Sequence, residues 1–286
     1  MVKGSHRRVL LAAAVVAVVF TGAALAGNSA SFSDPAGDGN PAPDLTGLTV
    51  SNDDAGMVTI KVSLANRATL SAADEVTVGI DSDQNPDTGG VFYGAEFELT
   101  LEGNSAKFLR EAPDGYYDEA PSPSSFQASS GGGVVTFTFK AAEVGVSSGF
   151  YVYGLGFAAG RVDTAPDIRT FNYQMISGEL PPVLGPDRRA PLDEAIKSKG
   201  VHGKVAQLLY FSADGRGETS DTIRVYRGSR LLKRIVTRLE DTNPFFSYAV
   251  PWRVPRTVRG KLRFCVSSVD RAGNRGKQSC AALTIS

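Results

Sequence analysis

The chain has 286 residues, with 30 acidic and 30 basic side chains and therefore a formal net charge of zero. This length allows about two domains with hydrophobic cores of ordinary size. After the first residues no apolar stretch approaches the length of about 20 that a membrane span needs, so we expect no transmembrane segment.

The first 26 residues have the features of a signal peptide. Lys3, Arg7 and Arg8 precede an apolar run, and Ala24-Leu25-Ala26 supplies the small-x-small pattern of a signal-peptidase site. No cysteine stands at that site and no hydrophobic tail follows the last strand-like residues, so nothing in the sequence predicts an anchor. We expect a secreted, extracellular protein whose mature chain begins near Gly27.

The zero net charge hides a division between two halves. Residues 27–182 hold 21 acidic against 7 basic side chains, a balance of −14, whereas residues 183–286 hold 9 against 20, a balance of +11. The acidic half suits cations, and the basic half suits polyanions such as anionic cell-wall polymers, or the acidic half itself. The alternative is two solvated surfaces that keep the protein soluble.

Residues 27–182 indicate an antiparallel β-sandwich, jelly-roll-like. Residues 57–64 alternate, so that Val58, Ile60, Val62 and Leu64 are expected to face a core. No segment holds a long 3.6-residue period, and turn residues fill the gaps. We expect strands at Leu45–Ser51, Met57–Leu64, Glu75–Ile80, Ala95–Glu102, Ala106–Arg110, Val134–Lys140, Phe150–Phe157 and Thr170–Gln174.

The segment G-I-D-S-D-Q-N-P-D-T-G-G, residues 79–90, places an oxygen ligand at every second position. Ca²⁺ takes six to eight oxygen ligands, so this loop predicts a calcium site. It is not an EF-hand, because Pro86 and Phe92 stand where that motif has its glycine and its bidentate glutamate. The alternative is that these residues only form turns. The predicted ligands are Asp81, Asp83, Asn85 and Asp87, joined by Glu96 at the start of the next strand.

Three tyrosines in the loops of this domain are candidates for a ligand-binding surface. Tyr93 follows the acidic loop, and Tyr116 and Tyr117 lie in a proline-rich and acidic connection. Exposed aromatic rings beside carboxylates suit contact with a glycan. Tyr is amphipathic, however, and often covers a sandwich core with its hydroxyl in water.

Four prolines in residues 181–191, together with the change in charge, predict a Pro-rich linker at 183–200. Residues 201–286 then have the size of an immunoglobulin-like sandwich and carry alternating strands of their own. A cut near Gly185 is expected to leave two domains that fold independently. The expected strands are Lys204–Ser212, Thr222–Arg227, Arg230–Arg238, Ser247–Val250, Gly260–Val269 and Gln278–Ile285.

Cys265 and Cys280 are the only cysteines, and in an exported chain such a pair predicts a disulfide. With Ala272 and Gly273 at a hairpin tip, the two cysteines face each other across antiparallel strands. Catalysis by these thiols is not expected.

The first domain resembles extracellular bacterial sandwich domains related to DOMON and the family-nine carbohydrate-binding modules. The resemblance covers most of residues 31–175 and lies in D-P-A-G-D with P-D-L, V-G-I-D-S-D-Q-N-P-D-T-G-G, G-A-E-F-E-L and P-D-I-R-T-F-N-Y. It implies a jelly roll, structural calcium and, in some relatives, sugar or haem binding. Asp38 and Asp44 match the family's acidic first segment. The domain departs from these relatives in having neither histidine nor tryptophan.

The second domain is similar to Ig-like repeats of secreted actinobacterial proteins, through S-V-D-R-A-G-N-R-G and a closing strand. This similarity implies a fold and says little about function.

Little in the sequence indicates catalysis. His202 is the only histidine of the mature chain, which disfavours a nucleophile-histidine site and a zinc site. No glycine-rich phosphate loop occurs, and few aromatics accompany the basic residues, so we expect no nucleic-acid partner. We expect a non-catalytic binding or adhesion protein that presents a calcium-stabilised surface to glycan or cell-envelope ligands. The alternative is a secreted glycoside hydrolase, or a hydrolase accessory protein, that uses carboxylates of the first sandwich.

Overall fold

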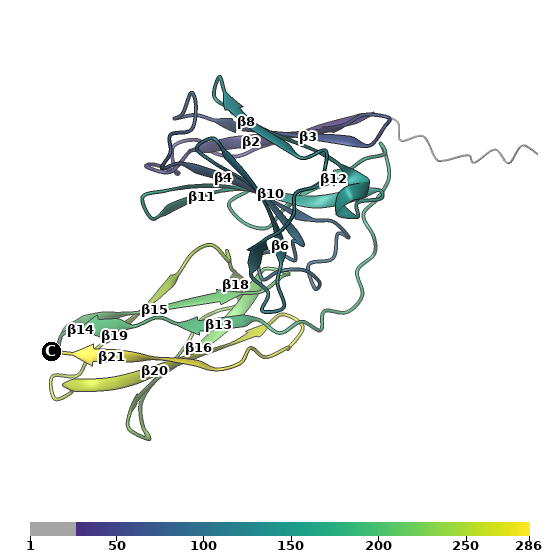
Figure 1. Cartoon of the computed structure of the whole chain (residues 1–286). Helices are drawn as coiled ribbons and strands as arrows, with labels where there is room; N and C mark the ends of the chain where they lie inside the picture. The colour runs from purple at the N-terminus through teal and green to yellow at the C-terminus, as the bar shows by residue number, and fades with distance from the viewer. Residues whose placement is uncertain (1–26) are drawn as a thin grey trace, which may run out of the picture.

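The structure is a computed structural model that describes residues 27–286, so the predicted signal peptide lies outside the described residues. Its regular elements are all strands except for one 3₁₀ helix, η1 (Ala141–Val144). The expected all-β class with two antiparallel sandwiches is confirmed. Figure 1 shows the two sandwiches one above the other, joined along one side by an extended segment.

The N-terminal sandwich packs a five-stranded sheet on a seven-stranded sheet. Alternating apolar residues explain this packing, as residues 57–64 illustrate. Every second side chain, at Val58, Ile60, Val62 and Leu64, is buried as predicted and belongs to the core between the sheets. In spatial order the first sheet is β1 (Asn28–Ser33), β2 (Leu45–Asn52), β3 (Met57–Leu64), β9 (Val134–Lys140) and β8 (Gln127–Gly131). The second is β11 (Arg161–Ala165), β10 (Gly149–Ala158), β4 (Glu75–Asp81), β5 (Phe97–Glu102), β6 (Ser105–Glu111) and β7 (Tyr117–Glu119), with β12 (Phe171–Gln174) also pairing with β10.

The C-terminal sandwich packs a three-stranded sheet on a six-stranded sheet around a separate core. All its strand pairs are antiparallel except β14 with β21. The smaller sheet is β13 (Leu192–Ala195), β15 (Val205–Ala213) and β19 (Tyr248–Arg253). The larger is β14 (Ser198–Gly200), β21 (Ser279–Ile285), β20 (Gly260–Asp270), β16 (Glu218–Arg227) and β17 (Arg230–Val236), with β18 (Glu240–Asp241) also pairing with β16.

The predicted linker at 183–200 is too long at its C-terminal end. No strand occurs between β12 and Leu192, but β13 and β14 then join the two sheets of the second sandwich. These strands are three and four residues long, so their alternation is too short to be read from the sequence. Whether the two parts fold independently stays a prediction.

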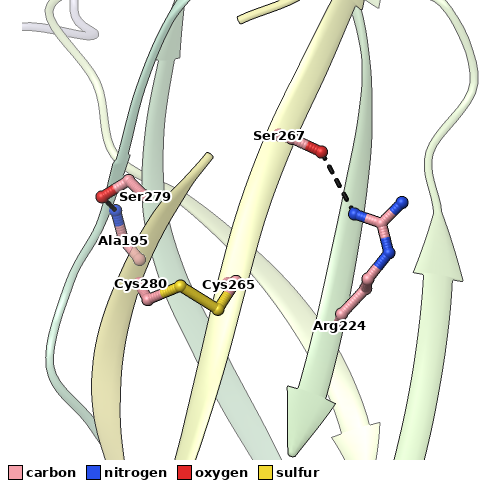
Figure 2. The surroundings of a disulfide bond; sticks show 6 residues. All are labelled: Ala195, Arg224, Cys265, Ser267, Ser279 and Cys280. Atoms are coloured by element: carbon pink, nitrogen blue, oxygen red, sulfur yellow. Dashed lines mark hydrogen bonds between the residues drawn. A yellow bond between two sulfur atoms is a disulfide. The ribbon is translucent and has the colours of Figure 1, made fainter. Parts of the chain in front are cut away.

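The predicted disulfide between Cys265 and Cys280 is present, and both cysteines occupy the same register position of β20 and β21 (Figure 2). A turn in which the Gly273 amide donates to the Asp270 carbonyl begins the connection between the two strands. Among the described residues, no helix is both long enough and apolar enough to cross a membrane.

Candidate functional site

The acidic loop between β4 and β5 brings three of its five predicted metal ligands together. Asp81 ends the buried strand β4, Asp83 lies two residues later, and Glu96 immediately precedes β5. One carboxylate oxygen from each lies within 4.8 Å of the others. Because β4 and β5 are antiparallel neighbours, the end of one strand and the start of the next meet at the same edge of the sheet.

Asp81 is the most unusual of these carboxyls. It is only 1% exposed; its Oδ1 accepts a hydrogen bond from the Asn85 amide (3.0 Å), and its Oδ2 is buried without a partner. Burial, reinforced by the neighbouring charge of Glu96, raises the pKa of Asp81 to about 9. Burying a carboxylate oxygen without a hydrogen-bond donor costs free energy of folding. Binding of a proton or a cation to this oxygen would remove that cost.

The other two carboxyls are partly satisfied from within the loop. Glu96 Oε2 accepts hydrogen bonds from the Ser82 amide (2.7 Å) and hydroxyl (3.0 Å), and the Thr88 hydroxyl donates to Asp83 (3.1 Å). Burial also raises the pKa of Glu96. These contacts hold the carboxyl groups in place and leave acceptor capacity on each of them.

The remaining two predicted ligands have other roles. The Asn85 side chain accepts a hydrogen bond from the Asp87 amide (3.3 Å). The Asp87 carboxylate accepts a bidentate pair of bonds from Arg216 of the second sandwich, at 3.0 and 2.7 Å. Asp87 therefore anchors the loop to the other domain, a role that sequence reasoning missed because Arg216 is 129 residues away.

The same loop is also held through its backbone. Arg189, in the segment between the sandwiches, donates to the carbonyl oxygens of Thr88 (2.7 Å), Gly89 (3.0 Å) and Pro86 (3.4 Å). Arg216 also donates to the Gly185 carbonyl (2.9 Å). The two arginines thus hold the acidic loop against the C-terminal sandwich.

The three predicted ligand-binding tyrosines do not form one exposed surface. Tyr93 is 3% exposed and its hydroxyl donates to the Thr242 carbonyl (3.4 Å) in the junction between the sandwiches, so the expectation that it is exposed is wrong. Tyr117 is half-buried, stacks on Phe92 and donates to the Ala95 carbonyl (2.7 Å). Only Tyr116, 43% exposed, is open to solvent. Aromatic packing across the junction, around Phe245, accounts for the difference.

Tyr116 lines a cleft between the sandwiches that the sequence did not predict. The cleft has a volume of about 420 Å³, and both domains contribute aromatic rings to it. Glu194 supplies a carboxylate among these largely apolar walls. Such a site, apolar with a few polar groups at a domain junction, is a common place for a ligand. The aromatic residues are Phe92 and Tyr116 from the first sandwich, and Phe211, Phe245 and Phe246 from the second.

Further groups of acidic side chains lie outside the predicted loop. Asp38 and Asp44, which match the acidic first segment of the family, meet Asp163 within 4.8 Å, and Asp38 also meets Asp34 and Asp167. Backbone amides supply hydrogen bonds to two of these carboxylates: Gly37 donates to both oxygens of Asp44, and Leu45 donates to Asp163 (2.6 Å), whereas Asp34 Oδ2 is buried without a partner. Asp187, Asp214 and Asp270 form another such group at the junction.

No protein-family model matches the sequence, and a comparison with curated proteins gives no match. Among solved structures, fibronectin(III)-like modules of CbhA from Clostridium thermocellum are 10% identical, with a TM-score of 0.24, over 81% of this chain and 86% of that one. A chimeric titin Z1Z2 tandem is 13% identical, with a TM-score of 0.24, over 81% and 92%. The glycoside hydrolase domain of Endo-D from Streptococcus pneumoniae is 10% identical, with a TM-score of 0.23, over 90% and 37%. These values carry no inference about function, and the resemblance to DOMON and family-nine carbohydrate-binding modules stays an expectation.

Proposed function

We propose that this chain is a secreted, non-catalytic binding or adhesion protein whose N-terminal sandwich is stabilised by Ca²⁺ bound at Asp81, Asp83 and Glu96. The observation that supports the metal is the unpartnered Oδ2 of Asp81, buried beside two further carboxylates. A hard divalent cation satisfies such oxygens, with backbone carbonyls and water completing its shell. Asn85 and Asp87 are left out of the ligand set, because their side chains shape and anchor the loop.

The spacing of the carboxylates favours a cation over glycoside hydrolysis. The two carboxyl groups of a glycoside hydrolase flank the scissile bond at about 5 to 9 Å, the wider spacings leaving room for the attacking water molecule. Here three carboxylates converge within 4.8 Å beside a strand end. The hydrolase alternative is therefore the weaker of the two proposals.

Thermal unfolding of residues 27–286 in chelator and in millimolar calcium tests the metal. Because the unfolded chain holds no such arrangement, binding should stabilise the fold by about 2.7 kcal/mol when free calcium is a hundredfold above the dissociation constant. That corresponds to a rise of roughly 5 to 10 °C in Tm. Mg²⁺ should act more weakly, since it demands a tight octahedron and gives up water reluctantly.

Asp83→Ala should abolish most of this rise, whereas Asp118→Ala, an exposed carboxylate on β7, should leave it unchanged. Equal Tm values for the wild type in the two buffers, with no metal in a native mass spectrum, would show that the loop residues are only turn formers.

We propose that the cleft lined by Tyr116, and not a surface formed by the three tyrosines, binds the glycan. Its aromatic walls suit the apolar face of a sugar ring, and Glu194 suits the hydroxyl groups at the ring edge. A glycan array screened with residues 27–286 should give hits that Tyr116→Ala weakens at least tenfold. Tyr226→Ala, which alters an aromatic ring on the far sheet, should keep them. Hits that respond equally to both variants would refute the cleft as the site.

A further inference from the structure

The charges of the C-terminal domain are separated along its length. All nine acidic residues of 183–286 lie in the segments 187–221, 240–241 and 270, whereas residues 222–239 and 251–269 contain eleven arginines and lysines and no acid. The acid-bearing end contacts the first sandwich: Arg216 reaches Asp87, and Asn243 donates to the Asp167 carbonyl (2.6 Å). The basic part of the domain is thus turned away from the acidic N-terminal sandwich.

Four of these cations project from the outer side of the larger C-terminal sheet. Along β16 and β20 the inward positions, such as Ile223, Val225 and Phe264, are buried in the core, so the residues between them point outward. In Figure 1 this sheet, with β16, β20 and β21, forms the layer farthest from the N-terminal sandwich. We call the outward cations the basic face: Arg224 on β16, Arg234 on β17, and Lys261 and Arg263 on β20.

The register places like charges beside one another. Arg224 is directly opposite Arg234, and Arg227 is opposite Arg230 at the end of the same strand pair. Arg224 donates to the Ser267 hydroxyl (3.2 Å; Figure 2), and Arg263 lies over the Tyr226 ring at 5.3 Å. Like charges directly opposite each other in a sheet are destabilising. Within residues 27–286, no carboxylate forms a salt bridge with any cation of the basic face.

The disulfide stiffens this surface. Cys265 is paired in register with Arg224 on one side and with Cys280 on the other, so the covalent bond joins β20 to β21 on the same outward side (Figure 2). A cross-linked sheet holds its cations at regular spacings, about 4.8 Å between strands and 6.8 Å between alternate residues.

We propose that the basic face is a docking surface for a linear wall polymer that carries phosphodiester groups. This inference rests on the proposed function in taking the chain to be an exported binding protein, and it requires neither calcium nor the cleft. Three of the four cations are arginines, whose planar guanidinium groups bind phosphate oxygens in pairs. An extended polymer can lie across the outer side of the sheet and relieve the repulsion between the opposed arginines.

Nucleic acid fits the surface less well. Stacking of single-stranded bases requires free aromatic rings, and the ring of Tyr226 on this side is covered by Arg263. Reading a duplex groove requires a projecting helix or ribbon, and the basic face is the side of a sheet.

The test is a binding titration of residues 27–286 with poly(glycerol phosphate) at low ionic strength, beside polygalacturonate, single-stranded DNA and neutral dextran. The triple variant Arg234→Gln, Lys261→Gln, Arg263→Gln should weaken binding of poly(glycerol phosphate) at least tenfold. The control triple Arg188→Gln, Arg275→Gln, Lys277→Gln removes the same charge from exposed positions elsewhere and should change it less than threefold. Binding should weaken between about 0.05 and 0.5 M salt, because screening tightens over that range.

Several results would overturn the proposal. These are no binding of poly(glycerol phosphate), equal losses in the two triple variants, or tighter binding of DNA or polygalacturonate than of poly(glycerol phosphate). Circular dichroism and Tm of both variants establish that they fold. Chelator should not affect the titration, so its outcome is separate from the calcium test.

Discussion

Asp81 and Asp193 are both buried carboxyls, but they differ in how their oxygens are satisfied. Asp81 has an oxygen without a partner at the edge of a sheet. Asp193, in the C-terminal sandwich, accepts from the Ser268 amide (2.8 Å) and from the Ser268 hydroxyl, which also contacts Asp221 (2.8 Å). Burial raises the pKa of Asp193 to about 6, although the bonds from Ser268 oppose the shift. One residue therefore suits a cation, and the other belongs to an internal polar network.

Asp193 should make the stability of the protein depend on pH in a definite direction. Its pKa in the folded state, about 6, lies above the ordinary value of 3.8. The stability that the protonated carboxyl contributes to the fold is therefore fully present below about pH 4 and is lost as pH rises through 6. Asp193→Asn cannot ionise; its amide oxygen can still accept from the Ser268 amide, while its NH2 group can donate to the Ser268 hydroxyl. Relative to the wild type, the variant should gain up to about 3 kcal/mol between pH 3.5 and 7.

Urea unfolding of both proteins across this pH range measures the difference. Glu194→Gln changes the exposed neighbour of Asp193 and serves as the control. A free-energy difference between Asp193→Asn and the wild type that stays constant from pH 3.5 to 7 would contradict the assignment.

Among the elements, the strands with long runs of alternating apolar and polar residues are predicted most accurately from the sequence. β3 begins and ends at the predicted residues, and the other long core strands agree within a few residues, except that β16 begins four residues earlier than predicted. The strands missed are short or polar edge elements such as β1, β7 and β18, in which apolar residues alternate over too few positions to be read from the sequence. The disulfide is predictable because its two strands are joined by a local turn.

At the candidate site, too, the sequence predicts contacts between neighbouring strands but not contacts between the two domains. Asp81, Asp83 and Glu96 meet because β4 and β5 are sequence neighbours, and the sequence is sufficient to bring them together. Asp87 and Tyr93 lie in the same connection between β4 and β5, but their hydrogen-bond partners, Arg216 and Thr242, come from the other domain. Local spacing carries no information about such contacts, so their roles required the structure.

On the scale of the whole molecule, the two sandwiches have separate cores and a shared junction. Tyr93 and Tyr153 of the first sandwich pack on Phe245 of the second, with ring centroids 6.2 and 5.2 Å apart. Gly79 leaves the space that the Tyr153 ring occupies on β4. Arg169 pairs with Asp241 at 2.7 Å, and Arg216 pairs with Asp87. The acidic loop is thus both a proposed metal site and one half of a domain junction.

This double role predicts that calcium binding and domain docking are coupled. Arg216 holds Asp87, four residues from Asp83, so its removal frees the loop and raises the cost of ordering the proposed ligands. Arg216→Gln should therefore lower calcium affinity about fivefold or more, the lower end of usual coupling energies. By reciprocity, calcium should tighten the junction, so the radius of gyration in small-angle scattering should decrease on adding calcium to the wild type and change less in the variant.

The matched control is Arg271→Gln, which removes an arginine of the same domain whose partner, Glu218, lies in that domain and not across the junction. Calorimetric titration of calcium into the three proteins gives the affinities directly. A diffuse electrostatic effect would change the calcium affinity of both variants equally, because each loses one positive charge. Loss of the contact with Asp87 lowers the calcium affinity of Arg216→Gln alone. Equal calcium affinity in Arg216→Gln and the wild type would mean that the loop is ordered by its own strand ends. The contacts of Arg216 and Arg189 would then hold the domains together without influencing the metal.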